Sequence, residues 1–434
     1  MDPRQIINDG RMSAVQIAAV AITVGLNALD GFDVLAISFA SPGIAAEWGI
    51  ERGALGIVLS MELVGMAFGS ILLGGVADRI GRRVMILASL VLMAIGMMAV
   101  TYTSSIVELS LWRVLTGVGI GGMIPCLNAM AAEYSNGRNR RLALSLMVIG
   151  YPGGVVLGGT IAALLLKDGG WRDVFHFGAL VTALFIPLVF FLLQETPQAL
   201  AARRGPNALE KINKQLARMK LATISELPAA QAKTAALPLA SLFSKNLFAT
   251  TLLVTLGYFG HIVVFYYVAK WTPSVVVDMG FQPSQAAGVL VWLSIGGVIG
   301  GGLFGIVAQR TSLKALTAIV LALTTGMLFV YGQGAKDLQH LSLVAAATGV
   351  VIQAGIVGIY TITAEAFPAY ARAAGTGFVI GAGRAGALLA PILAGFLFQA
   401  GLNLFTVSVT IGMASLVGAA LILMARLDKA NASG

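Results

Sequence analysis

Charged residues are scarce in this chain of 434 residues: they make up 11% of it, whereas 58% are hydrophobic and the mean hydropathy is +0.88. Soluble domains carry about 25% charged residues, so this composition excludes a soluble domain and indicates an integral membrane protein. Cys126 is the only cysteine, so no intrachain disulfide can form. The chain also lacks a histidine–cysteine cluster with metal-ligand spacing and a phosphate-binding glycine loop with its lysine. We therefore expect no enzyme, no bound metal or cofactor, and no use of ATP.

Long uninterrupted apolar runs are what the sequence has instead. They predict helices, because the strands of a membrane barrel alternate apolar and polar residues over about ten positions. A helix that crosses a bilayer needs roughly 20 apolar residues. Twelve runs qualify, at residues 14–40, 53–77, 84–102, 106–132, 142–166, 173–194, 247–270, 285–308, 313–333, 339–364, 374–398 and 402–425. The fold class that we expect is an all-α membrane protein with twelve transmembrane helices.

Lysine and arginine are distributed unevenly over the predicted loops. If both chain ends lie in the cytoplasm, 21 of the 28 fall on that side. Arg113 and Arg384 lie inside spans, and five residues remain for the outside: Arg52, Lys167, Arg172, Lys270 and Lys336. This excess is the positive-inside signal, so we expect both termini in the cytoplasm. The net charge of +9 then reports topology rather than binding of nucleic acid.

The start of the chain does not resemble a cleavable signal peptide. Its first 12 residues are polar, and the apolar run that follows them is too long for a signal sequence. We expect this run to stay in the membrane as the first span.

The longest polar segment divides the spans into six and six. It predicts an N-terminal half at residues 1–194, a cytoplasmic linker at 195–246 and a C-terminal half at 247–434. Within the linker, Leu209, Ile212, Leu216 and Met219 recur at helical spacing. This pattern predicts a short amphipathic helix on the cytoplasmic surface; a solvated, partly helical linker is the alternative.

The two halves repeat each other at an offset of 232 residues. Ala132-Glu133-Tyr134, at the end of the fourth span, matches Ala364-Glu365-Ala366 at the end of the tenth. The same offset maps Arg140 onto Arg372 and Gly154 onto Gly386. Such repeats are typical of six-span transporter halves with a substrate site near the membrane midplane between them.

Two aspartates lie deep in the first span, Asp30 and Asp33. Each costs roughly 2.5–3.5 kcal/mol to place there, so such residues normally face a partner or an aqueous path. Their spacing puts them on one helix face, and we interpret them as proton carriers. Asp33 lies at a depth similar to that of Arg113 and could pair with it; Glu62 is the competing partner. Alternatively, Arg113 snorkels to the interface, and Asp30 caps a helix broken at Gly31.

A second set of isolated polar groups lies in the C-terminal half. Arg384 is about ten residues deep in the eleventh span, and neither this span nor the last contains an acidic residue. A guanidinium suits bidentate binding of a substrate carboxylate, although a structural bond to carbonyls or to a carboxylate is the alternative. The other candidates for substrate binding are Tyr258, His261, Phe265, Gln353, Tyr360 and, on the polar face of the first span, Asn27. Aromatic packing around one satisfied histidine is the alternative for the seventh span.

The loop between the second and third spans reads Gly75-Val-Ala-Asp78-Arg79-Ile-Gly81-Arg82-Arg83. Its glycines allow two helix ends to approach closely, Asp78 can cap a helix, and the arginines can lock neighbouring helices. We interpret it as a gating loop; a plain positive-inside loop with turn glycines is the alternative. The corresponding segment of the second half has Gln309 where the aspartate would fall.

This loop resembles the signature of the major facilitator superfamily. The aspartate pair, the segment Arg113–Pro125 and Gly383-Arg384 are similar to those of its aromatic acid/proton symporter family. The resemblance implies the major facilitator fold and uptake of a hydroxybenzoate-like acid together with protons across a bacterial inner membrane. It further implies that Asp30 and Asp33 carry the coupling, to which we add Arg113 and Glu133, and that Arg384 holds the carboxylate. The expected partners are the acid, protons and the lipid bilayer, and the expected working unit is a monomer.

Three other functions remain open at this point. A drug/proton antiporter of the same superfamily is the first, but Val155 replaces the proline of the antiporter pattern in Gly150-Tyr-Pro-Gly-Gly154-Val155. A sugar or organic-cation carrier is the second, and Arg384 disfavours cations. A transporter-like sensor is the third, with no appended signalling domain to support it.

Overall fold

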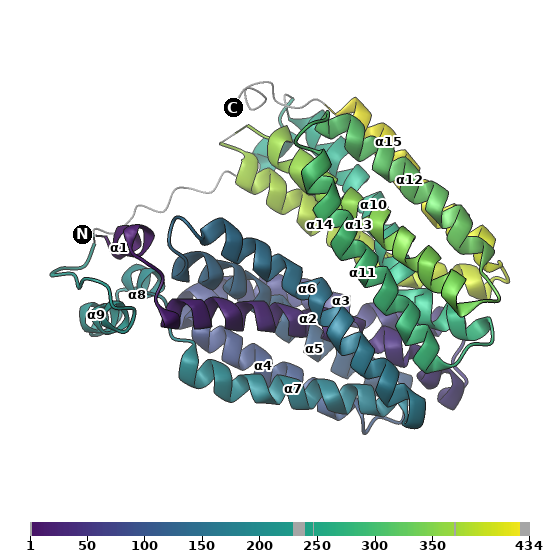
Figure 1. The fold of residues 1–434 in the computed structure, drawn as a ribbon, viewed down its shortest axis with the longest axis horizontal. Coiled ribbons are helices and arrows are strands. Elements are labelled where there is room, and N and C mark those ends of the chain that lie inside the picture. The colour runs from purple at the N-terminus through teal and green to yellow at the C-terminus, as the bar shows by residue number, and fades with distance from the viewer. Residues whose placement is uncertain (1, 229–238, 246, 369, 426–434) are drawn as a thin grey trace. The chain divides into compact units, whose positions relative to one another are not determined.

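The computed structural model describes residues 2–228, 239–245, 247–368 and 370–425, and only the backbone of Asp78 and Ala373. Residues 229–238 of the predicted linker and the C-terminal basic residues Arg426 and Lys429 therefore lie outside the described part. Twelve helices of this part are long and apolar enough to cross a membrane, which confirms the predicted number (Figure 1). They are α2 (Ala14–Trp48), α3 (Arg52–Ile80), α4 (Arg82–Val100), α5 (Ile106–Tyr134), α6 (Arg140–Asp168), α7 (Trp171–Leu192), α10 (Phe248–Asp278), α11 (Pro283–Val307), α12 (Leu313–Gln333), α13 (Leu338–Ala366), α14 (Arg372–Gln399) and α15 (Leu404–Met424).

Four short elements complete the described chain: α1 (Pro3–Asp9), α8 (Pro197–Arg203), α9 (Ala208–Arg218) and the 3₁₀ helix η1 (Leu239–Phe243). The predicted amphipathic linker helix is α9. Its apolar side chains Ile212 and Leu216 have no solvent exposure, and Met219, just after the helix, is 1% exposed. The helix packs beside α8. Protein therefore covers its apolar face, where we had expected the membrane surface to do so.

Two helices run further than the sequence predicted. The first span continues from residue 40 to Trp48, and the seventh from residue 270 to Asp278. Lys270 therefore lies inside α10 with no solvent exposure, and its assignment to an outer loop is wrong. The error arose because a charged residue was taken as the end of an apolar run that in fact continues through Trp271 to Val277.

The chain forms two compact units. The first consists of residues 1–36, 61–158 and 172–233, and the second of 37–60, 159–171 and 234–434. In the second unit, the later part of α2 and the first turns of α3 pack on C-terminal helices. The Ser41 and Ser274 hydroxyls lie 2.9 Å apart, Ser60 donates to the Leu388 carbonyl at 2.8 Å, and Arg52 pairs with Asp278.

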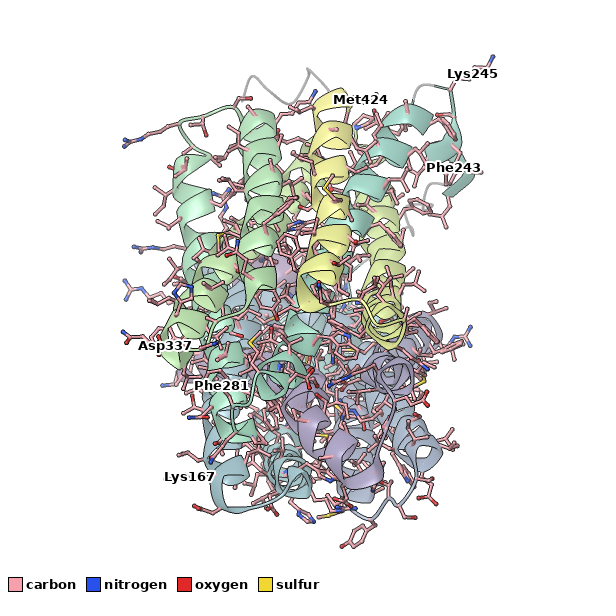
Figure 2. All side chains as sticks on the ribbon, turned by 90° about the vertical axis from the view of Figure 1, so that its right-hand side faces the viewer. Lys167, Phe243, Lys245, Phe281, Asp337 and Met424 are labelled. Atoms are coloured by element: carbon pink, nitrogen blue, oxygen red, sulfur yellow. The ribbon has the colours of Figure 1, made fainter. Side chains whose placement is uncertain are left out.

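The C-terminal helices of the second unit pack closely on one another. α11 and α12 both pack on α13, α10 packs on α14 and α15, and α12 runs beside α15 (Figure 1). Figure 2 shows Phe243, Lys245 and Met424 at one end of these helices and Phe281 and Asp337 towards the other. Successive helices therefore cross in alternating directions, as short connections between membrane spans require.

Close helix crossings in the first unit depend on glycine. A Cβ atom at Gly117 of α5 would collide with the main-chain oxygen of Glu62 on α3. One at Gly154 of α6 would collide with the oxygen of Ala28 on α2. Small residues at such positions let two helix backbones meet, which is how helices in a membrane gain packing energy.

The same crossings recur in the second unit at the predicted offset. A Cβ at Gly349, 232 residues after Gly117, would collide with the oxygen of Leu293, and one at Gly386 would lie 2.9 Å from the oxygen of Phe259. The helices that contain the matched motifs also agree in their limits: α5 and α13 end on these motifs, and α6 and α14 begin at Arg140 and Arg372. The internal repeat read from the sequence is therefore a repeat of packing.

We predict that Gly154→Ala destabilises the protein and Gly153→Ala does not. The Cβ at position 154 must displace the α2 backbone, which costs about 1–3 kcal/mol, whereas a Cβ at 153 meets nothing within 4 Å. Alanine also favours a helix over glycine by up to about 1 kcal/mol at both sites. Thermal unfolding of the purified protein in detergent should show a lower Tm for the first variant only; equal shifts would contradict the crossing.

Candidate functional site

Four charged side chains are buried together in the first unit. Asp30 and Asp33 come from α2, Glu62 from α3 and Arg113 from α5, and their exposed fractions are 1%, 0%, 0% and 0%. Asp30 lies within electrostatic range of both Asp33 and Glu62. Three acidic groups thus share this buried cluster with a single guanidinium.

Arg113 is held by four neighbouring helices. Its Nη2 pairs with the Glu62 carboxylate and donates to the main-chain oxygen of Asp33 at 2.9 Å. Its Nη1 lies 3.2 Å from Met97 Sδ on α4, and its Cζ lies 5.4 Å from the centroid of the Phe175 ring on α7. The acid paired with Arg113 is thus Glu62, the competing partner, and the expected ion pair with the Asp33 carboxylate is not formed. Because the guanidinium is fully buried, the alternative of a snorkelling arginine is wrong.

The carboxylates of Asp30 and Asp33 stand apart from this ion pair. Their oxygens are buried, and no described residue forms a hydrogen bond with them. The Asp33 carboxylate lies beside Gly178 of α7, where a Cβ atom would be 3.5 Å from its Oδ1. A Cβ atom at Gly178 would collide with Cε of Met97, so this glycine lets the Met97 side chain lie against α7.

The polar face around Asp30 serves helix packing as well. The Asn27 amide donates to the main-chain oxygen of Met147 on α6 at 2.6 Å, and the Thr23 hydroxyl donates to Val20 at 2.7 Å. α2 continues unbroken through Gly31, whose backbone packs against the main-chain oxygen of Tyr151. The alternative that Asp30 caps a helix broken at Gly31 is therefore wrong.

A second group of candidate residues lies in the second unit. The hydroxyls of Tyr258 on α10 and Tyr360 on α13 are 3.0 Å apart, and their ring centroids are 5.5 Å apart. A Cβ at Gly383 of α14 would collide with the Tyr258 ring, so this glycine lets the ring lie against α14. The next residue, Arg384, is half-buried and within electrostatic range of Tyr258. The structure thus brings one arginine and two tyrosine hydroxyls to one place.

His261 is not available to a ligand. Its Nδ1 lies 2.9 Å from Ser415 Oγ on α15 and its Nε2 lies 2.8 Å from the main-chain oxygen of Ile352 on α13. Because a carbonyl can only accept, Nε2 donates, and Nδ1 of the neutral ring accepts from Ser415. These two hydrogen bonds favour the alternative of a satisfied packing histidine over substrate binding by His261.

Two other candidates for substrate binding, Phe265 and Gln353, pack against neighbouring residues. Phe265 is half-buried, with its ring centroid 5.0 Å from that of Tyr266. Gln353 lies over the small residues Gly297 and Gly301 of α11, where added Cβ atoms would be 3.6 and 3.5 Å from its side chain.

The predicted gating loop is a tight junction between α3 and α4. Gly81 has a φ of 108°, a value that favours glycine, and a Cβ there would meet the side chains of Glu195 and Arg203. Arg82 pairs with Glu133 in the last turn of α5, and Arg83 donates to the main-chain oxygen of Phe190. Arg79 is exposed, a Cβ at Gly75 would have nothing within 4 Å, and the Asp78 side chain lies outside the described part.

Glu133 belongs to this junction rather than to the buried acidic cluster. Besides its ion pair with Arg82, its Oε2 accepts from the Thr196 hydroxyl at 2.5 Å. Thr196 is also the N-cap of α8. Glu133 thus ties the end of α5 to the start of α4 and to the linker, which contradicts our grouping of it with the proton carriers.

Two charged residues were missed by sequence reasoning. Lys270 is fully buried in α10, and the apolar run on both its sides was the signal that could have revealed it. Glu195 lies just after α7: it accepts from the Arg83 amide at 3.3 Å, and Arg203 Nη1 lies 4.0 Å from its Oε2. Burial raises the pKa of the Glu195 carboxyl, and hydrogen bonds from the amides of Arg83 and Thr196 act against this.

We predict that Glu195→Gln removes a pH dependence of stability. Folding raises the pKa of the Glu195 carboxyl. The contribution of this group to the free energy of unfolding is therefore greatest below its unfolded pKa, and it is lost as the pH rises through the folded pKa. The Tm of the variant relative to the wild type should therefore increase between pH 5 and pH 8. The exposed Glu226 of the linker is the matched control, and Glu226→Gln should show no such trend. A parallel pH course for Glu195→Gln and wild type would contradict the assignment.

Comparisons with known proteins agree with this architecture. The chain is 31% identical to the gallate transporter of Pseudomonas putida, covering 98% of this chain and 94% of the relative. It is 28% identical to the 4-hydroxybenzoate transporter PcaK of Pseudomonas aeruginosa (100% and 97%) and to the 3-(3-hydroxy-phenyl)propionate transporter of Escherichia coli (88% and 87%).

Solved structures show the same fold at lower identity. The D-xylose-proton symporter superposes with a TM-score of 0.72 at 17% identity, covering 96% of this chain and 98% of that one. A bacterial homologue of the human lysosomal transporter Spinster, inward-facing and occupied, gives 0.73 at 15% identity (98% and 97%). The model of the Major Facilitator Superfamily matches residues 23–338. The chain therefore belongs to the Major Facilitator Superfamily of membrane transporters, and it is not an enzyme.

Proposed function

We propose that the protein imports an aromatic carboxylate of the hydroxybenzoate type together with protons, by alternating access. The observation that carries this proposal is the pair Asp30 and Asp33, whose carboxylates are buried and form no hydrogen bond with any described residue. A buried carboxylate of this kind is far cheaper to keep as the neutral acid than as the ion. It can take up a proton when the site opens to water and give it up on the other side.

Arg384, Tyr258 and Tyr360 form the proposed substrate site. A guanidinium can hold a carboxylate through two parallel hydrogen bonds. The tyrosine hydroxyls can form hydrogen bonds with hydroxyl groups on the ring of the substrate. The names of three relatives, which carry gallate, 4-hydroxybenzoate and a hydroxyphenyl propionate, support an acid with an aromatic ring.

The orientation and the organisation of the chain are part of the proposal. The excess of lysine and arginine in one set of loops favours cytoplasmic termini in a bacterial inner membrane. The working unit is a monomer with six-helix halves at residues 1–194 and 247–434, joined by the linker at 195–246. The junction of Arg82 with Glu133 acts as a lock on the cytoplasmic side.

The transport cycle follows from these assignments. In the outward-open state, Asp33 or Asp30 takes up a proton, and the anion binds at Arg384. With the aspartate neutral and the substrate carboxylate paired with Arg384, neither group carries an unpaired charge through the conformational change. The protein then opens inward, and the acid and the proton leave.

The first test is uptake of labelled 4-hydroxybenzoate and gallate into proteoliposomes under an imposed inward proton gradient. We expect gradient-dependent accumulation by the wild type and none by Asp30→Asn or Asp33→Asn, because an amide cannot exchange a proton. Glu108→Gln, which removes an exposed carboxylate at the start of α5, is the control and should accumulate normally.

Accumulation by an aspartate variant at the wild-type level would refute coupling through that residue. Absence of uptake, together with proton-driven movement of a lipophilic cation, would replace symport by drug/proton antiport.

The substrate site makes a separate prediction. Arg384→Ala should raise the substrate concentration needed for half-maximal uptake by about 100-fold, because truncating one side of a buried charge pair costs roughly 2–5 kcal/mol. Arg384→Lys keeps the charge but loses the planar guanidinium. Its substrate concentration for half-maximal uptake should lie between those of the wild type and Arg384→Ala. Normal binding by a folded Arg384→Ala protein would show that the carboxylate binds elsewhere.

A further inference from the structure

Arg113 lies within reach of two acidic residues from different helices. Its Nη2 pairs with the carboxylate of Glu62 on α3 and at the same time donates to the main-chain oxygen of Asp33 on α2 at 2.9 Å. Met97 and the Phe175 ring fix the guanidinium from two other helices. It can therefore stay in place while the carboxylate that neutralises it changes.

Among the described residues of the helices packed on this cluster, the other charged side chains have partners elsewhere or lie in terminal turns. On α7, Arg172 donates to the main-chain oxygens of Thr101 and Thr103, and His176 pairs with Asp173 at 3.6 Å with both side chains nearly half exposed. The charges of α4 and α6 lie in their terminal turns: Arg82, Arg83, Arg140, Arg141, Lys167 and Asp168. One guanidinium thus faces three carboxyl groups, and it can match the charge of one of them.

We propose that Glu62 sets the proton affinity of Asp33 by competing with it for Arg113. While Glu62 holds the guanidinium, the Asp33 carboxyl forms no ion pair or hydrogen bond with a described residue and keeps its proton. When that proton leaves for water, the carboxylate left on Asp33 turns to the guanidinium of Arg113 and replaces Glu62 as its counterion. Glu62 is therefore a positioning residue for proton release, and this inference rests on the proposed role of Asp33 in coupling.

Asp33 is better placed than Asp30 for this exchange. Arg113 already donates to the main-chain oxygen of Asp33, so a rotation of the Asp33 side chain is the only movement that the new ion pair needs. Asp30 lies within electrostatic range of Asp33 and Glu62, and it acts on both through its charge.

The pH profile of Glu62→Gln tests the competition. With Glu62 neutral, Arg113 is released to Asp33 and stabilises its ionised form, so more acid is needed to load the proton. The pH of half-maximal gradient-driven uptake should move at least about one unit to the acid side, a tenfold loss of proton affinity. Glu108→Gln should leave the profile unchanged. A wild-type profile in folded Glu62→Gln would overturn the proposal.

A measurement that requires no transport keeps the inference separate from the proposed function. Thermal unfolding in detergent is compared for Glu62→Gln, Asp33→Asn and the double variant. Each single variant leaves Arg113 one of its two acids, so each should fold with a modest loss in Tm. The double variant removes both and should lose much more than the sum of the two.

Additive losses, or failure of Glu62→Gln alone to fold, would overturn the exchange. If the wild type transports no aromatic acid but the losses are strongly non-additive, the proposed function fails while the competition for Arg113 stands.

Discussion

The cost of a buried charge is the constraint on which the first unit depends. Arg113 is fully buried, and its ion pair with Glu62 offsets the free-energy cost of removing the guanidinium from water. The contact has a backbone cause. Gly117 of α5 lies directly on the main-chain oxygen of Glu62, so the glycine that brings α3 and α5 together also brings the acid to the level of the arginine. Packing and charge pairing are therefore one feature of this crossing.

The ion pair between Arg113 and Glu62 determines the surroundings of the two aspartates. Because the single guanidinium is occupied by Glu62, Asp30 and Asp33 remain buried without a hydrogen-bonding partner among the described residues. An aspartate firmly paired with arginine would hold its charge throughout a transport cycle. One that is deprived of its counterion responds to protons, and this is the property that coupling requires.

The polar groups at the end of α5 have a different task. Arg82, Glu133 and Thr196 join α4, α5 and the linker through direct hydrogen bonds and an ion pair. Gly81 permits this because its positive φ turns the chain between α3 and α4 and leaves no side chain in the way of Glu195. The junction is partly solvated, so its ion pairs can break at modest cost, which suits the lock proposed for the cytoplasmic side.

The sequence by itself determined the twelve spans, the internal repeat and the depth of Asp30, Asp33, Arg113 and Arg384, because apolar runs and isolated charges are local features that the membrane makes costly to misplace. Only the tertiary structure decided which residues form ion pairs and hydrogen bonds with the buried polar side chains. Depth along a helix does not give its rotation, so the sequence could not choose between Asp33 and Glu62 for Arg113, nor see that Ser415 and Ile352 occupy both nitrogens of His261. Lys270 was misplaced for the same reason: whether a charge ends a span or is enclosed within it depends on the helices packed around it.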